Sequence, residues 1–430
     1  MKKTSEHNPL SLLKYNRFDI PAKTLYVKFR ERKYNSIWGT EIYKEHLNIW
    51  NGFSEILNCG KDSFYKFIYE FDSIIDSMKV NGFLKDYPII LNDNEMVING
   101  SHRLSSSIYF NINVFSRISD NSDKEGQWKC FYDFFKNRSK YPSENNKTLN
   151  NLDIKYLDAM ACEYCELKKN TYVIILYPSV QFNDIVEKTI LRKCDIVYKK
   201  EINLNKFGLF NLIKHIYFGM EWIGHWDNMF NGICEKLKFC YSQLNQTIAY
   251  LVESDSLENI IDIKKSIREI YKIDNHSCHT TDNHYDSLNL ARALFNNNSI
   301  HFLNNSLQKN FKNFNCFFSE YKKRINVKNE DDFCVVGSSV LGLYGIRDVE
   351  DLDFLHSDDF IFCETNGISS HNKEIKYYKK SKDDIIHNPQ NYFWYEGVKF
   401  CSLDTIIDMK KNRKEKKDLD DLELIERYEL

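Results

Sequence analysis

The sequence lacks any apolar stretch long enough to cross a lipid bilayer. Its longest apolar runs, such as residues 172–177, fall far short of the roughly 20 residues that a membrane-spanning helix needs. The N-terminal stretch MKKTSEHNPLSLLKY has lysines at positions 2 and 3 but no continuous apolar segment, so no secretory signal is expected. We therefore expect a soluble, cytoplasmic protein with no membrane span.

An excess of either charge is also missing. The chain contains 59 Lys and Arg against 61 Asp and Glu, which gives a formal net charge of −2. That balance excludes a globally basic nucleic-acid coat but is compatible with a local basic patch. A nucleic-acid partner is therefore less favoured than a small molecule.

The paired CxxC motifs of a zinc site are absent as well. Twelve cysteines are spread along the chain, and a large cytosolic protein usually keeps such thiols reduced. The one close pair, Cys162 and Cys165, has no matching second pair, so it is a weak signal for zinc binding or redox chemistry. We favour an ordinary helical surface for this pair.

The length of the chain predicts several domains. A prior of roughly 100–200 residues per domain suggests two to four domains for 430 residues. The content of 42% hydrophobic and 15% aromatic residues is enough to form packed cores. Polar stretches at 119–126 and 137–151 indicate a first boundary near residue 145. The prediction is a multidomain α/β protein with domains at residues 1–145, 146–326 and 327–430.

The central segment alternates between strand-like and helix-like patterns. Strands are expected at 171–177 and 195–198, and helices at 183–193 and 209–218. Further apolar residues recur at helical spacing in 257–271 and 285–296. This alternation predicts a central α/β domain, whose role the sequence does not indicate.

The strongest chemical pattern lies near the C-terminus, in CVVGSSVLGLYGIRDVEDLDFL. A strand at 333–336 runs into a turn at Gly337 and then a short helix at 340–344, and a second strand follows at 352–355. Because side chains alternate along a strand, Asp351 and Asp353 share one face. Two adjacent carboxylates repel unless they share a cation, and Mg²⁺ binds carboxylates together with nucleotide phosphates. The alternative is a solvated loop beside a simple turn.

This stretch resembles the signature of the nucleotidyltransferase superfamily, a Gly-Ser turn followed about a dozen residues later by Asp-apolar-Asp-apolar. The tail SLDTIIDMKKNRKEKKDLDDLELI is similar to the end of the abortive-infection type of these enzymes, with Asp418 and Asp421 in the last helix start. The stretch GSSVLGLYGIRD also resembles the phosphocholine transferases of surface glycans. The resemblance covers roughly the last hundred residues, and it implies a mixed sheet with flanking helices.

The resemblance implies a metal-dependent transfer of a nucleotidyl or phosphoryl group. Mg²⁺ and ATP or CTP would be the cofactors, with Asp351 and Asp353 as the metal ligands. A third carboxylate is usual in the family, and Asp404 and Glu396 are the candidates. The residues implied in catalysis are Asp351, Asp353, Lys410 and Arg413, and those implied in nucleotide binding are Gly337, Ser338, Ser339 and Lys417.

A second pattern lies in DYPIILNDNEMVINGSHRLSSSIYF. Residues 88–91 and 96–98 read as a hairpin, and Ser101 as the N-cap of a helix at 102–110. The stretch resembles the ParB/sulfiredoxin-like domain, a small α+β domain. That likeness implies ATP or CTP binding through Gly100, Ser101, His102 and Arg103. Ser101 stands where sulfiredoxins carry Cys, which excludes their redox reaction; the alternative is a degenerate domain used only for packing.

Two further stretches carry polar or aromatic clusters. The stretch NHSCHTTDNHYD could bind a transition metal or form a loop that positions phosphate, although a solvated loop is the commonest reading. Its candidate groups are His276, Cys278, His279, Asp282, His284 and Asp286. The stretch GMEWIGHWDNMFNG could stack aromatic rings on a sugar or base, or belong to a core.

Two functions are therefore open. The first is a transferase acting on a small or glycan-related hydroxyl acceptor, with surface-polysaccharide assembly as one setting; a tRNA or protein acceptor fits the abortive-infection likeness instead. The second is a nucleotide-sensing binding or regulatory module, or a defence toxin, with a tRNA, DNA or protein partner.

Overall fold

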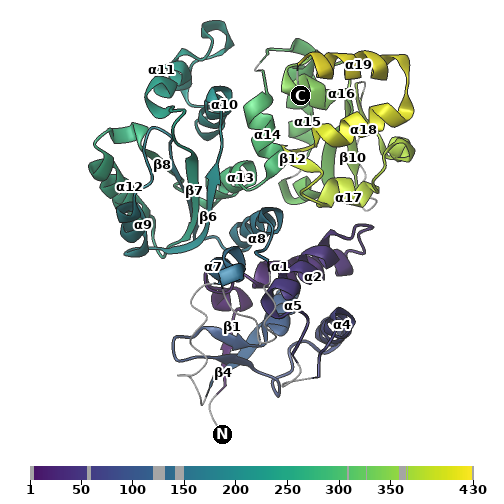
Figure 1. Cartoon of the computed structure of the whole chain (residues 1–430). Coiled ribbons are helices and arrows are strands. Elements are labelled where there is room, and N and C mark those ends of the chain that lie inside the picture. Colours follow the sequence, from purple (N-terminus) through teal and green to yellow (C-terminus); the bar gives the residue numbers. More distant parts are fainter. Residues whose placement is uncertain are drawn as a thin grey trace. The chain divides into compact units, whose positions relative to one another are not determined.

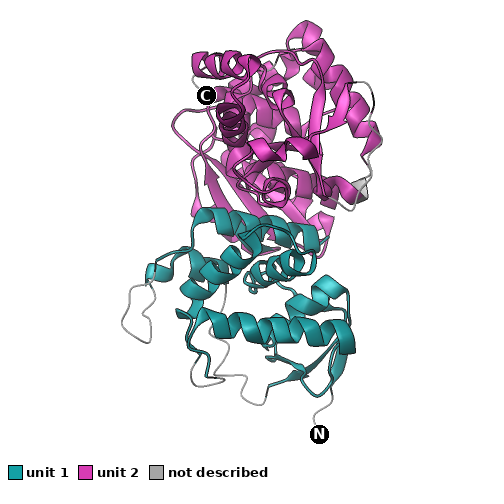
Figure 2. Cartoon of the chain, turned by 90° about the vertical axis from the view of Figure 1, so that its right-hand side faces the viewer, with its two compact units in different colours: residues 1–169, 195–198 teal, residues 170–194, 199–430 magenta. Residues whose placement is uncertain are grey.

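The computed structural model describes residues 4–55, 60–119, 131–140, 150–307, 309–325, 327–357, 365 and 367–428. The chain divides into two compact units, residues 1–169 with 195–198 and residues 170–194 with 199–430 (Figure 2). The boundaries expected near residues 145 and 326 lie outside the described residues. The division into three domains stays a prediction.

The first unit contains a four-stranded sheet with the strand order β1-β4-β2-β3. Its strands are β1 (Ser5–His7), β2 (Ile89–Leu91), β3 (Val97–Asn99) and β4 (Val114–Ile118). β2 and β3 pair antiparallel, as the predicted hairpin requires. The Asn92 side chain closes their turn, because it accepts hydrogen bonds from the backbone of Asn94 and Met96.

The helices of the first unit pack chiefly against one another. They are α1 (Ile20–Glu31), α2 (Trp38–Asn51), α4 (Phe64–Asn81), α5 (Ser101–Phe110), α7 (Phe131–Lys136) and α8 (Ile154–Leu167), with short 3-10 turns at Pro9–Leu12 and Arg138–Lys140. Helix α5 also contacts β2. In α4, Phe67, Phe71 and Ile75 recur every four residues and are buried in the core. The CxxC pair lies on α8, but Cys165 is fully buried, so the expectation of a helical surface was wrong for that residue.

The start of α5 differs from the prediction. Ser101 is the first helical residue, and Gly100 occupies the N-cap position with φ of +100°. That backbone conformation favours glycine, which has no Cβ, so the helix begins one residue earlier than expected. The predicted role of Ser101 as the N-cap was therefore wrong.

The second unit begins with a sheet of order β6-β7-β5-β8. Its strands are β5 (Thr171–Leu176), β6 (Asp195–Ile202), β7 (Thr247–Glu253) and β8 (Cys278–Thr280). β5 pairs antiparallel with both β7 and β8. The associated helices, of which α9 and α12 pack together (Figure 1), are α9 (Asp184–Leu191), α10 (Lys206–Ile216), α11 (Asn231–Cys240), α12 (Leu257–Tyr271), α13 (His284–Leu294) and α14 (Asn297–Asn305), with 3-10 turns at Glu221–Ile223, Trp226–Asn228 and Asp274–His276.

A five-stranded mixed sheet of order β11-β10-β9-β13-β12 completes the second unit. Its strands are β9 (Phe333–Val336), β10 (Leu352–His356), β11 (Ile368–Ser370), β12 (Tyr392–Tyr395) and β13 (Val398–Cys401). β9 pairs antiparallel with β10 and parallel with β13. The flanking helices are α15 (Lys312–Arg324), α16 (Ser338–Tyr344), α17 (Lys382–His387), α18 (Leu403–Arg413) and α19 (Lys416–Arg427), with 3-10 turns at Val327–Asp332 and Asn372–Tyr377.

The predicted mixed α/β class is confirmed. Residues of α15 spaced three or four apart, Phe314, Phe318 and Tyr321, are buried in one core with the central strands β9 and β10. Within the described residues, no helix is both long and apolar enough to cross a membrane.

Candidate functional site

The turn after β9 brings the chain against an acidic side chain of the next strand. Gly337 has φ of +66°, and a Cβ built there would lie 2.9 Å from Asp353 Oδ2. The register of the two strands explains this approach, because Asp353 of β10 is paired with Val336, the last residue of β9. A glycine is therefore needed at this turn both for its conformation and for the space that the carboxylate occupies.

The carboxylate of Asp353 is nearly buried. Asp353 is 8% exposed, and Ser369 of the neighbouring strand β11 donates a hydrogen bond of 3.4 Å to its Oδ1. Burial and, after it, the negative charge of Asp351 raise the pKa of Asp353 to about 7. The charge of Asp351 therefore acts on Asp353, and a metal site shared by the two acids stays a prediction.

Asp351 comes directly before β10 and is half-buried. The side chains that alternate with the acids, Leu352 and Phe354, are fully buried in the core. The buried hydroxyl of Ser339 donates to the backbone carbonyl of Asp351 at 3.3 Å, which ties the acidic strand start to α16. Ser338 is half-buried, so its hydroxyl is the more accessible of the two predicted phosphate contacts.

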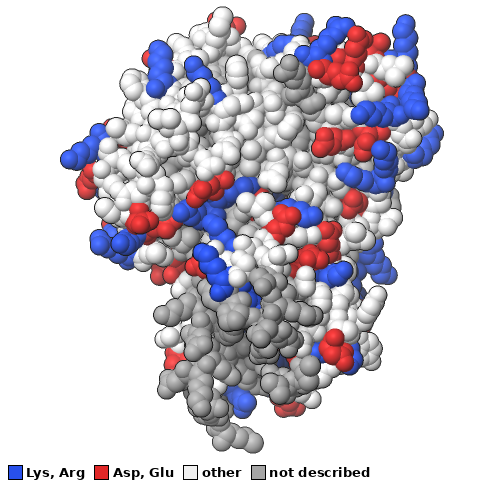
Figure 3. All heavy atoms as spheres, in the orientation of Figure 1, with Lys and Arg blue, Asp and Glu red and all other residues white. Residues whose placement is uncertain are grey.

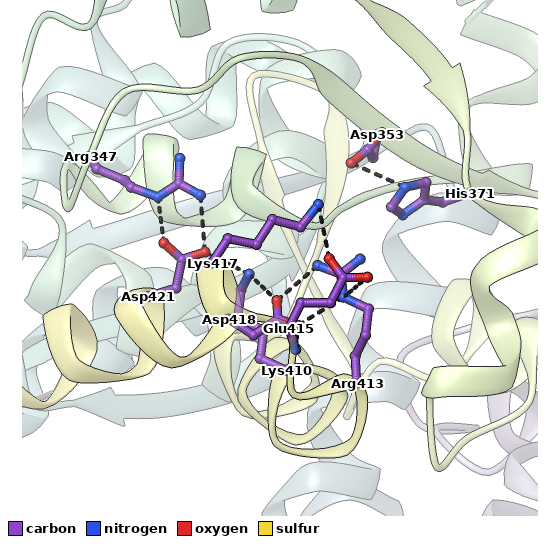
Figure 4. A network of polar contacts seen from close by, with 9 residues as sticks. All are labelled: Arg347, Asp353, His371, Lys410, Arg413, Glu415, Lys417, Asp418 and Asp421. Carbon is purple, nitrogen blue, oxygen red and sulfur yellow. Dashed lines mark hydrogen bonds and ion pairs between the residues drawn. The ribbon is translucent and has the colours of Figure 1, made fainter.

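A histidine that the sequence reasoning missed lies beside Asp353. His371 Nε2 is 3.3 Å from Asp353 Oδ2 (Figure 4). The backbone N–H of His371 donates to the carbonyl of Phe354 at 2.8 Å, which holds the residue at the end of β11. Burial lowers the pKa of His371, so the ring is neutral near pH 7. A neutral imidazole thus adjoins a carboxyl that is half-protonated at the same pH.

The predicted cations of α18 form a buried network with the acids of α19 (Figure 4). Lys410 is 2% exposed, and its Nζ donates to Asp421 Oδ2 at 2.6 Å and to Asp418 Oδ1 at 3.2 Å. Arg413 donates to both oxygens of Asp418, at 2.9 and 2.8 Å, and this hydrogen bonding raises its pKa. Arg347 binds both oxygens of Asp421.

Glu415 also belongs to this network, because its Oε1 lies 3.8 Å from Arg413 Nε, so the three cations face three carboxylates. Arg413 and Lys417 both act to lower the pKa of Asp353, which places their charges in the electrostatic field of the acidic pair. Lys417 is exposed, and its Nζ lies 3.3 Å from Glu415 Oε2. Figure 3 shows basic and acidic side chains crowded together over α18 and α19.

The structure therefore groups most of the predicted C-terminal residues. Asp351, Asp353 and Gly337 are in contact or in electrostatic range, with the positive charges of Arg413 and Lys417 nearby. Lys410 lies beneath this group and holds α18 to α19. Its predicted catalytic role, like that of Arg413, stays a prediction.

The two candidates for a third carboxylate lie elsewhere in the second unit. Glu396 forms an ion pair with Lys322 at the turn between β12 and β13. Asp404 is exposed in the first turn of α18, and its charge acts on His301 and Tyr344. The carboxylates whose charges act on His371 are those of Glu374 and, to a smaller extent, Asp351.

The predicted N-terminal group belongs to the first unit. His102 Nε2 is 2.9 Å from the Tyr43 hydroxyl, and burial lowers the pKa of the imidazole. Arg103 donates to the carbonyl of Tyr87 and to Asn99 Oδ1. The backbone carbonyl of Ser101 accepts a 2.9 Å hydrogen bond from the Ser105 hydroxyl. The polar side chains of His102 and Arg103 are thus engaged with protein partners, and nucleotide binding through Gly100 to Arg103 stays a prediction.

No protein-family model, curated protein or solved structure matches this chain. The likeness to nucleotidyltransferases and to ParB-like domains accordingly rests on the residues quoted above, and any function must be argued from the geometry of the site itself.

The residues at this site fit a magnesium ion better than a transition metal. Across the part of the chain that the structure describes, no group of three or more His, Cys, Asp or Glu side chains is arranged to hold a metal. The alternative of a transition-metal site around His276 and His279 is therefore not supported. Mg²⁺ needs only one or two carboxylates, because water and phosphate oxygens supply its other ligands. The Asp353 carboxylate itself occupies the space beside Gly337, so the turn sets a carboxylate oxygen against backbone that carries no side chain.

Proposed function

We propose that the second unit transfers a nucleotidyl or phosphoryl group from ATP or CTP to a hydroxyl acceptor, with Mg²⁺ held by Asp351 and Asp353. The observation that carries this proposal is the 2.9 Å approach of the Asp353 carboxylate to the Cβ position of Gly337. A turn without a side chain next to paired acids is what a phosphate–metal complex needs in order to approach the backbone.

The bound ion would supply charge neutralisation on the phosphoryl oxygens. Asp351 and Asp353 would fix its position, since Asp353 is held by the register of β10 with β9 and Asp351, directly before β10, is held at its carbonyl by Ser339. The Ser338 hydroxyl at the start of α16 and the exposed Lys417 are suited to bind the polyphosphate. Lys410 and Arg413 would act indirectly, because they keep α19 in place through Asp418 and Asp421.

The reaction forms a bond between the acceptor oxygen and phosphorus and breaks the bond between that phosphorus and the leaving phosphate oxygen. The acceptor hydroxyl must lose a proton in this step. His371 is our candidate to receive it, because its ring is neutral near pH 7 and lies 3.3 Å from Asp353. The acceptor class, a sugar or polyol, a tRNA or a protein, stays a prediction.

Transfer of labelled phosphate or nucleotide from Mg-ATP and Mg-CTP would test the proposal. Turnover should fall at least about a hundredfold in Asp351→Asn and in Asp353→Asn, because each variant loses a carboxylate that would hold the ion neutralising the transition-state charge. Asp420→Asn, an exposed carboxylate on α19, is the matched control and should keep full turnover. Full turnover in Asp353→Asn, or nucleotide binding without turnover in every variant, would instead favour a binding module.

A further inference from the structure

The second unit contains a large cavity that the transfer site does not use. Its volume is about 960 Å³, and residues of α10, α11, α12, β8 and α13 line it together with β12 of the five-stranded sheet. Strands β9 and β13 lie between β12 and β10, the strand of Asp353. At about 4.8 Å per strand, β12 lies roughly 14 Å from β10. The volume is in the range of pockets that hold a cofactor-sized ligand.

Positive charge converges at one end of this cavity. Lys236 of α11 and Lys264 and Arg268 of α12 line it. After burial, the charges of these three side chains are the causes that lower the pKa of His279, to about 3. Lys236 is 7% exposed, and its Nζ donates to the carbonyl of Asn275 at 2.9 Å.

In the described residues this cluster has one close carboxylate, that of the exposed Asp274, so two of its three cations have no ion-pair partner there. Arg268 Nη1 lies 3.7 Å from Asp274, whose side chain is 82% exposed, and Arg268 Nε is buried without a hydrogen-bond partner there. Glu235, which also lines the cavity, binds Lys238 at 2.6 Å. Three converging cations repel each other, so an anion bound among them would lower their energy. A phosphate or diphosphate group has the required charge and acceptor oxygens.

The cavity wall also offers buried polar atoms and open aromatic rings. Thr280 Oγ1 and Asn211 Oδ1 belong to side chains at most 4% exposed, and neither atom has a hydrogen-bond partner among the described residues. Buried polar groups are normally paired, so both are suited to a ligand's hydroxyl or amide. Trp222, Phe239 and Tyr285 line the same cavity with exposures of 44%, 61% and 64%. Flat rings at a pocket rim stack on a nucleobase.

We propose that this cavity binds a nucleoside diphosphate, free or carrying a further group, with its diphosphate at Lys236, Lys264 and Arg268. The base stacks on the aromatic rim, and the ribose or base edge meets Thr280 and Asn211. This site is separate from the transfer site and does not depend on the proposed transfer reaction. It gives a role to the two stretches, 219–232 and 275–286, that the transferase site leaves unused.

Titration calorimetry on the full chain in EDTA, with ADP, CDP, UDP and pyrophosphate as probes, tests the inference. The double variant Lys264→Gln/Arg268→Gln should bind the preferred diphosphate at least about 100-fold more weakly, because each of the two lost charge-assisted contacts weakens binding roughly tenfold or more. Both side chains are half-exposed on α12, so the variant is expected to fold, which circular dichroism checks. Lys265→Gln makes the same charge change on the exposed face of α12 and should bind like the wild type.

A second pair of variants separates the parts of the ligand and the two sites. Trp222→Ala should weaken nucleoside diphosphate binding and leave pyrophosphate binding unchanged. Asp353→Asn should bind every probe as the wild type does, whether or not it transfers phosphate. The inference is overturned if no nucleoside diphosphate binds the wild type, if Lys265→Gln weakens binding as much as the double variant, or if Asp353→Asn abolishes binding.

Discussion

Replacing Asp353 with Asn should make the second unit more stable at neutral and alkaline pH. The carboxyl is nearly buried beside Asp351, and its pKa is raised to about 7 from the ordinary value of 3.8. Below pH 3.8 the group is protonated in both the folded and the unfolded chain, so it has no effect. Between pH 3.8 and 7 the unfolded chain releases a proton that the folded chain keeps, so the free energy of unfolding falls as the pH rises.

The size of the effect follows from the two pKa values. They differ by about three pKa units, and each unit corresponds to about 1.36 kcal/mol of free energy between the two protonation states. Ionising Asp353 in the folded protein therefore costs about 4 kcal/mol above pH 7. The amide of Asn does not titrate and has nearly the same shape, so it can still accept from Ser369. The difference between Asp353→Asn and wild type should open from near zero at pH 4 to about 4 kcal/mol at pH 8.

Urea unfolding of the full chain at a series of pH values measures this difference, with Asp420→Asn as the exposed-carboxylate control. The control should stay within about 0.5 kcal/mol of wild type at every pH. Addition of Mg²⁺ at pH 8 should restore stability to the wild type and not to Asp353→Asn, because a ligand stabilises the state that binds it. An unchanged or lower stability of Asp353→Asn at pH 8 would refute the raised pKa and the crowding of the two acids.

Two further substitutions test the surroundings of the site. Gly337→Ala should lower stability by about 1–3 kcal/mol, because φ of +66° strains any other residue and the Cβ would meet Asp353 Oδ2. A thermal melt and the transfer assay check this prediction. An unaltered melting temperature would contradict the close approach of Gly337 to Asp353. Asp418→Asn should cost about 3–5 kcal/mol at pH 7, because Lys410 and Arg413 lose a buried partner. Although burial acts to raise the pKa of Asp418, its cations hold that pKa below 3.8, so the stabilisation is present above pH 3.8 and is lost as the pH falls below it. Urea denaturation of Asp418→Asn and of the control Asp420→Asn at pH 7 and at pH 3 measures the loss of stability. An equal loss of stability in Asp418→Asn and Asp420→Asn at pH 7 would contradict the prediction.

Local periodicity predicted much of the second unit. The apolar spacing over 257–271 corresponds to the observed helix α12. The alternation around Asp353 predicted its position opposite the turn, because strand geometry fixes which side chains share a face. The start of α19 was less predictable, since Glu415 and Asp418 form a capping box that begins the helix at Lys416, earlier than the apolar pattern does.

Features formed by distant segments could not be read from the sequence. His371 reaches Asp353 only because β11 pairs parallel with β10, and no local pattern marks that pairing. The cavity joins residues from Asn211 to Glu396, so its cationic end depends on how α11, α12 and β8 pack. The cap at Gly100 depended on a backbone angle that the sequence Asn-Gly-Ser does not specify by itself.

The ion-pair network between α18 and α19 has a consequence for how the protein is made. The ammonium group of Lys410 sits in the interior, and both of its carboxylate partners belong to the helix that follows. During translation this cation emerges from the ribosome before Asp418 and Asp421, the counter-ions that it has among the described residues. The five-stranded sheet and its flanking helices should therefore pack stably only after α19 has been synthesised. Any chemistry at Asp351 and Asp353 would be delayed until this part of the second unit has folded.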